Sequence, residues 1–368
     1  MSWTVGVVGA GVISPAYLTT LTAADDISVA WIADIEPARA QTRAEAFAVP
    51  RWGHPDELLG PVKVDAVVNL TPPSEHAALT LRALRAGSHV WSEKPLGLDD
   101  NELRDIIRTA REVGRRVGSA PDTVLSPIAQ AGIAAVRGGR IGTSTHALAI
   151  FQSAGPERWH PRPAPFFAAG AGPVLDMGPY YVTVLIQALG KPVAVSAVGG
   201  RSRTTRIALA DESGQTVFPV DVDTHVSAHI EFESGAVATV VLSWDCALRR
   251  AGILEISGDK GTVIFPDPNR FDGSAQYRHL DGTVEELADS GTGDTGEGAV
   301  AGRGVGVIAL LKAAADAQPT YVDDVWAAAV ISTLFAVERA VRSGQRVPVE
   351  FVDAVAFEDG FTAPAGTF

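Results

Sequence analysis

The stretch VGVVGAGVIS, residues 5–14, decides how the first part of this chain folds. A short apolar run ends in Gly9-x-Gly11, and a pattern typical of a helix follows it. At such a turn the first glycine permits the tight bend, and the second lets the backbone approach a pyrophosphate. Ser14 takes the third position of the G-x-G-x-x-G pattern, so packing of helix on strand is slightly less close than with glycine. The stretch favours a dinucleotide-binding turn, and a plain strand-to-helix turn is the alternative.

The second apolar run strengthens this interpretation because it ends in an acid. Residues 31–34, WIAD, place Asp34 23 residues beyond Gly11, where a carboxylate accepts hydrogen bonds from ribose hydroxyls. The same charge repels a 2′-phosphate and no arginine follows before Arg39, so NAD is favoured and NADP is the alternative. A solvated turn aspartate would also fit this pattern. The expected cofactor contacts of this region are Gly9, Gly11, Val12, Ile13 and Asp34.

The first 120 residues alternate short apolar runs with helical patterns. Short apolar strands that alternate with helices predict a parallel sheet covered on both faces. The expected strands are 3–8, 29–33, 64–70, 89–91 and 116–119, and the expected helices are 13–24, 38–47, 74–86 and 99–113.

A different pattern begins after residue 121, which divides the chain into expected domains at 1–121 and 122–368. Ser-Gly and Gly-Asp pairs separate several β-type runs and are hairpin signals, so this second sheet is predicted to be largely antiparallel. Residues 288–304 are low in bulky side chains and are expected to form a loop. The expected strands are 143–151, 193–200, 224–233, 236–245, 251–257 and 261–265, and the expected helices are 126–138, 173–189 and 323–342.

The composition is that of a globular protein whose main activity is not nucleic-acid binding. A length of 368 residues suits two domains, and the net charge of −13 argues against binding to a phosphate backbone. No run of 18 apolar residues predicts a membrane span, and the N-terminus lacks the charged segment of a secretion signal. The single cysteine, Cys246, suits a reducing compartment, so the cytoplasm is the expected location.

Three motifs further along the chain resemble those of one oxidoreductase family. The run TPPSEH at 71–76 resembles a T-P-x-x-x-H turn, and EKP at 93–95 matches an E-K-P signature. The run GAGPVLDMGPYY at 170–181 resembles a helix in which an Asp and, four residues on, a His or Tyr complete the active site. Together they are similar to the Gfo/Idh/MocA oxidoreductases, the glucose–fructose oxidoreductase and inositol dehydrogenase family. The resemblance implies an α/β protein: a Rossmann doubly wound parallel sheet, then an α/β domain with a large open, mostly antiparallel sheet.

The resemblance assigns the chemistry to three residues. In that family the E-K-P lysine reaches the substrate and the nicotinamide, and here that lysine is Lys94. Asp176 and Tyr180 are four residues apart on one expected helix, so they share a face. The family more often has His where this chain has Tyr180, as in the glucose–fructose oxidoreductase and dihydrodiol dehydrogenase branches. A nearby ammonium lowers the pKa of a tyrosine, so Tyr180 would take the hydroxyl proton while Asp176 orients the sugar or the tyrosine. A turn lysine without a role and a tyrosine packed in the core are the alternatives.

Other residues are candidates for substrate contacts. The segment RWHP at 158–161 could line a sugar pocket, with Trp159 stacked on an apolar sugar face, although a packed surface loop fits equally well. His160 is a reserve candidate for the base. Asp122 and Thr123 follow the last strand of the first domain, and such strand ends border the ligand crevice. The expected substrate contacts are Lys94, Asp122, Thr123, Trp159, His160, Asp176 and Tyr180.

His76 opens a helix whose N-terminus should face the cofactor, so it either contacts the cofactor or serves the helix end. The further expected cofactor contacts are Thr71, Pro72, His76, Glu93 and Lys94. No metal site is expected. His225 and His229 lie on an expected strand, where four residues span about 13 Å, too far for two ligands of one zinc.

The leading hypothesis is therefore an NAD(P)-dependent oxidoreductase that acts on a secondary alcohol of a sugar, glycoside or cyclitol. One alternative is an oxidoreductase that retains tightly bound NAD(P) and recycles it on a second sugar. Another is a non-catalytic NAD-binding regulator. The resemblance also implies a homodimer or homotetramer that pairs through the C-terminal sheet.

Overall fold

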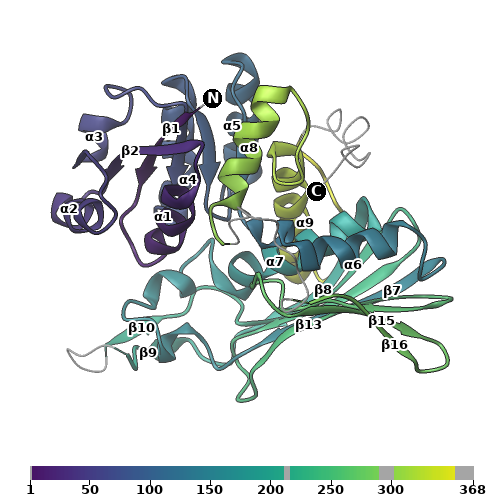
Figure 1. Cartoon of the computed structure of the whole chain (residues 1–368). Coiled ribbons are helices and arrows are strands. Elements are labelled where there is room, and N and C mark those ends of the chain that lie inside the picture. Colours follow the sequence, from purple (N-terminus) through teal and green to yellow (C-terminus); the bar gives the residue numbers. More distant parts are fainter. Residues whose placement is uncertain (1, 211–215, 290–301, 353–368) are drawn as a thin grey trace. The chain divides into compact units, whose positions relative to one another are not determined.

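The computed structural model describes residues 2–210, 216–289 and 302–352 (Figure 1). Most of the loop expected at 288–304 lies outside these residues. The described chain forms two compact units: residues 2–125 with 302–328, and residues 126–289 with 329–351. Residues 302–328 thus group with the N-terminal unit, although a division at 121/122 places them in the other domain. No helix in the described part of the chain is long and apolar enough to span a bilayer.

The N-terminal unit is built on a six-stranded sheet in the order β3-β2-β1-β4-β5-β6. The sheet is parallel throughout, as the sequence predicts, and the short β3 was not expected. This order is that of a doubly wound nucleotide-binding fold. Its strands are β1 (Trp3–Val8), β2 (Ile27–Ala33), β3 (Trp52–Gly53), β4 (Ala66–Asn69), β5 (His89–Ser92) and β6 (Val117–Ser119). Its helices are α1 (Ser14–Ala23), α2 (Pro37–Ala46), α3 (Pro55–Leu58), α4 (Pro73–Arg85), α5 (Asp100–Glu112) and α8 (Val305–Asp316).

Two glycines make room for the tryptophans in the core of this unit. A Cβ on Gly6 of β1 would lie 2.2 Å from the ring of Trp31 on β2, which is fully buried. A Cβ on Gly306 of α8 would lie 2.1 Å from the ring of Trp91 on β5. Backbone that approaches a ring this closely has no space for a side chain, so these glycines fix how β1 and α8 pack.

Helix α8 was not expected from the sequence, and Asp122 holds its N-terminus. The Oδ2 atom of Asp122 accepts hydrogen bonds from the backbone N–H groups of Gly304 (2.6 Å) and Gly306 (3.3 Å). An acid at a helix N-terminus satisfies N–H groups that have no partner within the helix. Asp122 is fully buried, and burial raises its pKa to about 6 although the charge of Arg303 opposes the shift.

The second unit is built on a nine-stranded sheet in the order β16-β15-β14-β13-β7-β12-β11-β8-β17. Only β7 and β12 pair in parallel, so the prediction of a large, mostly antiparallel sheet is confirmed. Its strands are β7 (Ser144–Gln152), β8 (Pro192–Gly200), β11 (His225–Phe232), β12 (Val237–Ser243), β13 (Arg250–Gly258), β14 (Gly261–Ile264), β15 (Ser274–His279), β16 (Val284–Asp289) and β17 (Val347–Pro348).

Helices α6 (Pro127–Arg137) and α7 (Gly172–Leu189) cover one face of this sheet (Figure 1). Helix α6 packs against β14, β15 and β16, and α7 packs against β7, β11 and β12. Residues 329–343 of α9 (Asp324–Ser343) also belong to this unit. On β11 the alternate residues Val226, Ala228, Ile230 and Phe232 share one face and all are buried.

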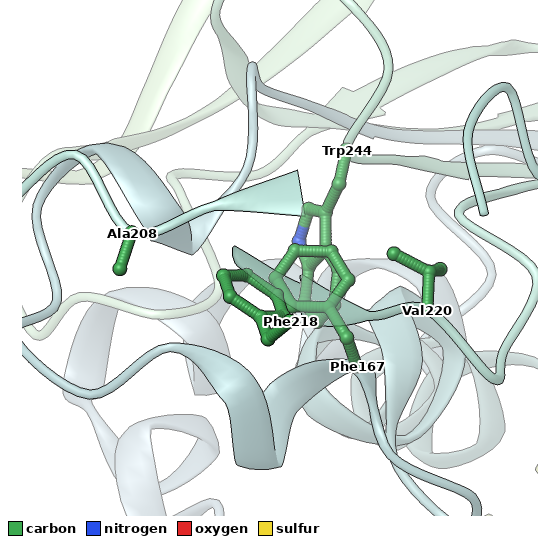
Figure 2. Packing of buried hydrophobic residues seen from close by; sticks show 5 residues of the cluster. All are labelled: Phe167, Ala208, Phe218, Val220 and Trp244. Carbon is green, nitrogen blue, oxygen red and sulfur yellow. The ribbon is translucent and has the colours of Figure 1, made fainter. Parts of the chain in front are cut away.

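A small apolar cluster lies apart from the sheet, under the loop that precedes α7. It is formed by Phe167, Ala208, Phe218, Val220 and Trp244 (Figure 2). The hairpin of β9 (Thr205–Ile207) and β10 (Val217–Pro219) supplies one side, and the single turn η3 (Ala164–Phe167) supplies another. The rings of Phe167 and Trp244 meet edge to face with centroids 5.1 Å apart. This hairpin was not expected from the sequence.

The raised pKa of Asp122 predicts a pH-dependent stability. Between about pH 4 and pH 6 this carboxyl group is ionised in the unfolded chain but protonated in the folded chain, so unfolding releases a proton. A rise in pH across this window therefore favours unfolding. This pH dependence is absent in Asp122→Asn. From pH 4 to pH 7 the free energy of unfolding of the variant should therefore rise relative to that of the wild type, by up to about 3 kcal/mol.

Urea unfolding of both proteins at several pH values measures this difference. Asp105→Asn, on the exposed side of α5, is the matched control and should track the wild type at every pH. A difference in the free energy of unfolding between Asp122→Asn and wild type that stays constant from pH 4 to pH 7 would contradict the raised pKa of Asp122.

Candidate functional site

The turn after β1 has the geometry that a bound pyrophosphate requires. Gly9 has φ +102°, and a Cβ on it would lie 2.6 Å from the carbonyl oxygen of Leu70, so only glycine fits. A Cβ on Gly11 would meet nothing within 4 Å, which leaves its backbone open to a ligand. Ser14 is fully buried and its hydroxyl donates to the carbonyl of Gly11 at 2.8 Å, so serine at the third position is accommodated. The side chain of Val12 is 79% exposed beside this turn.

The side chain of Asp34 is held in place by the turn itself. Its Oδ2 accepts a hydrogen bond from the N–H of Ala10 and its Oδ1 accepts one from the N–H of Glu36, each at 2.9 Å. A carboxylate offers about four acceptor sites, so each oxygen retains capacity for a ribose hydroxyl. Asp34 is 8% exposed at the end of β2. The residues present at Gly9, Gly11 and Asp34 therefore fit a dinucleotide.

His76 joins the two motifs that follow β4 and β5. Its Nδ1 lies 2.7 Å from the carbonyl oxygen of Pro95, and its Nε2 lies 2.7 Å from that of Thr71. The side chain is 1% exposed, and burial lowers its pKa. The hydroxyl and N–H of Thr71 both donate to Oδ1 of Asn69, and Pro72 is the residue before α4. A neutral ring donates to only one of these two carbonyl oxygens. The contact with the cofactor that is expected of His76 stays a prediction.

The E-K-P turn is fixed by contacts of Glu93. Its Oε1 accepts a hydrogen bond from the hydroxyl of Tyr17 (2.7 Å), and its Oε2 accepts one from the N–H of Lys94 (3.2 Å). The Nε1–H group of Trp91 donates to the same Tyr17 hydroxyl at 3.2 Å. Burial, and then the charge of Glu93, raise the pKa of Tyr17 well above its ordinary value, so it remains a donor. The Lys94–Pro95 peptide bond is cis. Lys94 thus leaves β5 from a braced turn, although Tyr17 had not been singled out in the sequence.

In the second unit, α7 carries Asp176 and Tyr180 one turn apart, as expected. Tyr180 is 6% exposed and Asp176 is half-buried. A Cβ on Gly178 would lie 2.6 Å from Leu334, so glycine here lets α9 approach α7 closely. The next residue, Tyr181, is fully buried and its hydroxyl accepts the N–H of Gly252 at 3.0 Å. Tyr181 is therefore bound to the sheet.

The loop before α7 brings Trp159 and His160 together. Trp159 is 65% exposed, and its ring meets that of His160 edge to face with centroids 5.4 Å apart. The Nδ1 atom of His160 accepts the N–H of Arg162 (3.0 Å), so the neutral ring carries its proton on Nε2. Burial lowers the pKa of His160, whereas the charge of Asp176 opposes the shift. The charge of Asp176 therefore acts on the imidazole of His160.

Asp122 and Thr123 lie in the single turn η1 (Asp122–Leu125) and are 0% and 2% exposed. The carboxylate of Asp122 is engaged by the N-terminus of α8. The substrate contacts expected of Asp122 and Thr123 stay predictions. Among the described residues, no group of three or more His, Cys, Asp or Glu side chains is arranged to hold a metal ion.

A buried ion network near Trp159 was not anticipated from the sequence. The guanidinium of Arg206 on β9 bridges the carboxylates of Glu157 and Asp245. These three residues are far apart in the chain and form no recognisable motif. Nothing in the sequence marks these residues as partners, because the contacts that join them are long-range.

Comparisons with known proteins agree with this geometry. A family model described as "Oxidoreductase family, NAD-binding Rossmann fold" matches residues 3–120. A second model, the GFO/IDH/MocA C-terminal domain, matches residues 130–264. The two matches cover both units and most of the chain.

Named relatives are dehydrogenases. D-glucoside 3-dehydrogenase of Escherichia coli K12 is 27% identical over 302 residues, which are 77% of this chain and 83% of the relative. Trans-1,2-dihydrobenzene-1,2-diol dehydrogenase of Bos taurus is 27% identical over 268 residues, 72% of this chain and 74% of the relative. A levoglucosan dehydrogenase structure in complex with NADH and levoglucosan has a TM-score of 0.81 at 20% identity, with 95% of this chain and 100% of that chain covered. At that identity the likeness shows a shared fold.

The position of Asp34 predicts cofactor preference. In Asp34→Asn the charge that favours ribose hydroxyls and repels a 2′-phosphate is lost, so the dissociation constant for NADH should rise about tenfold while that for NADPH rises less or falls. Fluorescence titration with both cofactors measures this. Damage to the turn would weaken both equally, so the ratio of the two constants is decisive. Glu45→Gln, on the exposed side of α2, is the control, and an unchanged ratio in Asp34→Asn would contradict the role.

Proposed function

The chain belongs to the Gfo/Idh/MocA oxidoreductase family, and from this premise we propose that it transfers a hydride between a secondary alcohol of a sugar, glycoside or cyclitol and NAD. The observation that carries the proposal lies within the N-terminal unit. Because the strands are parallel, the turn after β1, Asp34 after β2 and Lys94 after β5 all follow carboxyl ends at one edge of the sheet. Lys94 is a cation in a braced turn at this edge of the sheet, the edge suited to bind a dinucleotide. It is therefore suited to act on a substrate held there.

Oxidation of a secondary alcohol removes a hydride from carbon and a proton from oxygen. Bound NAD supplies the hydride acceptor, C4 of the nicotinamide. The proposal assigns the proton to Tyr180, whose phenolate is stabilised by the ammonium of Lys94. Asp176, one turn before Tyr180 on α7, orients the hydroxyl that reacts or the tyrosine. In reduction the same groups return the proton.

The sugar-binding part of the proposal involves the loop before α7. The exposed indole of Trp159 is suited to stack on the apolar face of a sugar ring, and Nε2–H of His160 is suited to donate to a hydroxyl. The dehydrogenase names of the relatives support substrates of this class. His160 is the second choice for the base; to accept a proton at Nε2 its ring would have to take the other tautomer and lose the hydrogen bond that Nδ1 accepts from the N–H of Arg162.

Two further readings make different predictions about the purified protein. An enzyme that recycles a retained cofactor would carry nicotinamide absorbance through purification. A non-catalytic regulator would bind NAD without turnover. The presence of Lys94, Asp176 and Tyr180 together favours catalysis, because a sensor has no need of a proton-transfer group.

The proposal extends to assembly and location. Half-buried Val237, Thr239 and Val241 line the face of β12 opposite to its buried residues, and a second copy on that face would give a homodimer or homotetramer. The single cysteine supports action in a reducing compartment such as the cytoplasm.

The function is tested by NADH formation at 340 nm over a panel of sugars, glycosides and inositols, with NAD and NADP in separate assays. Turnover with NAD on at least one cyclic polyol is expected. Lys94→Ala should abolish it, because the reacting oxygen and the base lose their cation, while NADH still binds. Lys63→Ala, which removes an exposed lysine hydrogen-bonded to Ala86, is the control and should retain activity. Tight NAD binding with no turnover across the panel would move the assignment to the retained-cofactor enzyme or the regulator.

Tyr180→Phe tests the base. Loss of one hydroxyl should lower kcat at least a hundredfold, with the dissociation constant of NADH within about twofold, because general-base catalysis contributes about 10² to 10⁴. Tyr181→Phe makes the same change one residue later. It removes the hydrogen bond to Gly252 and should lower the melting temperature but leave kcat near normal. Near-normal kcat in Tyr180→Phe would transfer the role to His160.

A further inference from the structure

A buried ion network fastens the loop that carries Trp159 and His160. The Nη1 group of Arg206 donates to Oε1 of Glu157 (2.5 Å), and its Nη2 group donates to the carboxylate of Asp245. The Nη1 group also contacts the carbonyl oxygens of Trp244 (3.1 Å) and Ala154 (3.4 Å). One side chain on the β9–β10 hairpin thus joins the start of the loop, the middle of the loop and the end of β12.

The network is largely shielded from water. The side chains of Arg206, Glu157 and Asp245 are 3%, 6% and 16% exposed. The guanidinium lies over the ring of Phe167, 5.0 Å from its centroid. Phe167 belongs to the apolar cluster that Figure 2 shows. Burial alone would raise the pKa of Asp245, but hydrogen bonds from Thr224 and Ser202 and the charge of Arg206 lower it, so this carboxyl group stays ionised.

The backbone of the loop is adapted to the same network. Gly155 has φ +98°, and a Cβ on it would lie 2.1 Å from Oε2 of Glu157 and 2.8 Å from Nη1 of Arg206. The loop therefore passes directly over the ion pair, which requires glycine there. A second link is the N–H of Leu209, beyond β9, which donates to the carbonyl oxygen of Glu157 at 2.9 Å.

Buried ion pairs add little net stability compared with well-packed apolar residues, so stability does not by itself account for this network. What a guanidinium does supply is direction, because its donors lie in a rigid planar fork. Glu157, which this fork holds, lies two positions before Trp159 and three before His160. Holding Glu157 sets the positions of the exposed indole and of the His160 ring relative to Asp176. The charge of Asp176 acts on His160 by raising its pKa.

We propose that Arg206 is a positioning residue for substrate recognition: through Glu157 it holds Trp159 and His160 as a platform for a ring-shaped polyol beside Asp176. The inference rests on the proposed function and narrows its substrate class to cyclic polyols with an apolar ring face. Acyclic polyols lack such a face and gain little from the indole.

Arg206→Lys keeps the charge and removes the fork. In this variant KM for a cyclic substrate should rise at least tenfold, while kcat changes less and the dissociation constant of NADH stays within about twofold. KM for an acyclic polyol should change little. Arg270→Lys is the matched control, because Arg270 makes a similar forked pair with Asp272 at 2.6 and 2.7 Å but is exposed. An unchanged KM for the cyclic substrate in Arg206→Lys would overturn the proposal.

A double-mutant cycle separates positioning from general damage. Trp159→Ala should itself raise KM for the cyclic substrate. In that background Arg206→Lys should raise KM further by less than about twofold, because residues that act through one another are not additive. Additive effects would show that Arg206 does not act through the platform. Gly155→Ala perturbs the network from the loop side and should reproduce the rise in KM if Arg206→Lys fails to fold.

Backbone hydrogen exchange tests the positioning role without any substrate. In Arg206→Lys, or in Gly155→Ala, amides of residues 153–162 should exchange at least tenfold faster than in the wild type, while those of β11 and β12 are unchanged. Unchanged exchange in the loop would overturn the positioning role even in an active enzyme. Faster exchange in a protein that turns over no sugar would instead mean that the proposed function had failed and that the loop support stands.

Discussion

The rest of the candidate cofactor site depends on the close approach of the β1 end to its two neighbours. The N–H of Gly9 donates to Ala33 at the end of β2 (2.8 Å), and the Cα of Gly9 lies against the backbone of Leu70, beyond β4. No side chain fits between them. Because the three strand ends are this close, the turn at Gly11, the carboxylate of Asp34 and the Thr71 turn must lie next to one another. A larger residue at Gly9 would separate all three.

The position of Lys94 also depends on its surroundings, because residues that do no chemistry themselves support it from several sides. His76 holds the carbonyl of Pro95, Tyr17 holds the carboxylate of Glu93, and α8 packs on Trp91 just before the turn. A lysine side chain has four rotatable bonds and a high conformational entropy. Bracing its backbone reduces the number of positions that its ammonium can reach, which is the requirement for a group that acts on one atom of a substrate.

Local patterns predicted much of the fold, and long-range contacts explain the rest. Strand β1 and helices α1 to α7, except the short α3, begin and end within about one residue of expectation, because apolar periodicity is a property of neighbouring residues. Helix α8 was missed because Asp122, which holds its N-terminus, lies about 180 residues earlier in the chain. Asp34 was predictable because its spacing from Gly11 is fixed by one βαβ unit. The role of His76 was not, since it depends on the carbonyl of Pro95, and nothing in the sequence marks Arg206 as the partner of Glu157.

The adjacent tyrosines of α7 show why position on a helix matters as much as residue type. Burial raises the pKa of Tyr181 above its ordinary value although the hydrogen bond from the N–H of Gly252 opposes the shift, so Tyr181 remains a phenol while the protein is folded. A group that never ionises cannot accept a proton from an alcohol. Tyr180 points about 100° away and shares a face with Asp176, a residue that can orient a hydroxyl. Tyr181, buried and bound to the sheet, is therefore a poor base. If a tyrosine of α7 is the base, Tyr180 is the better candidate.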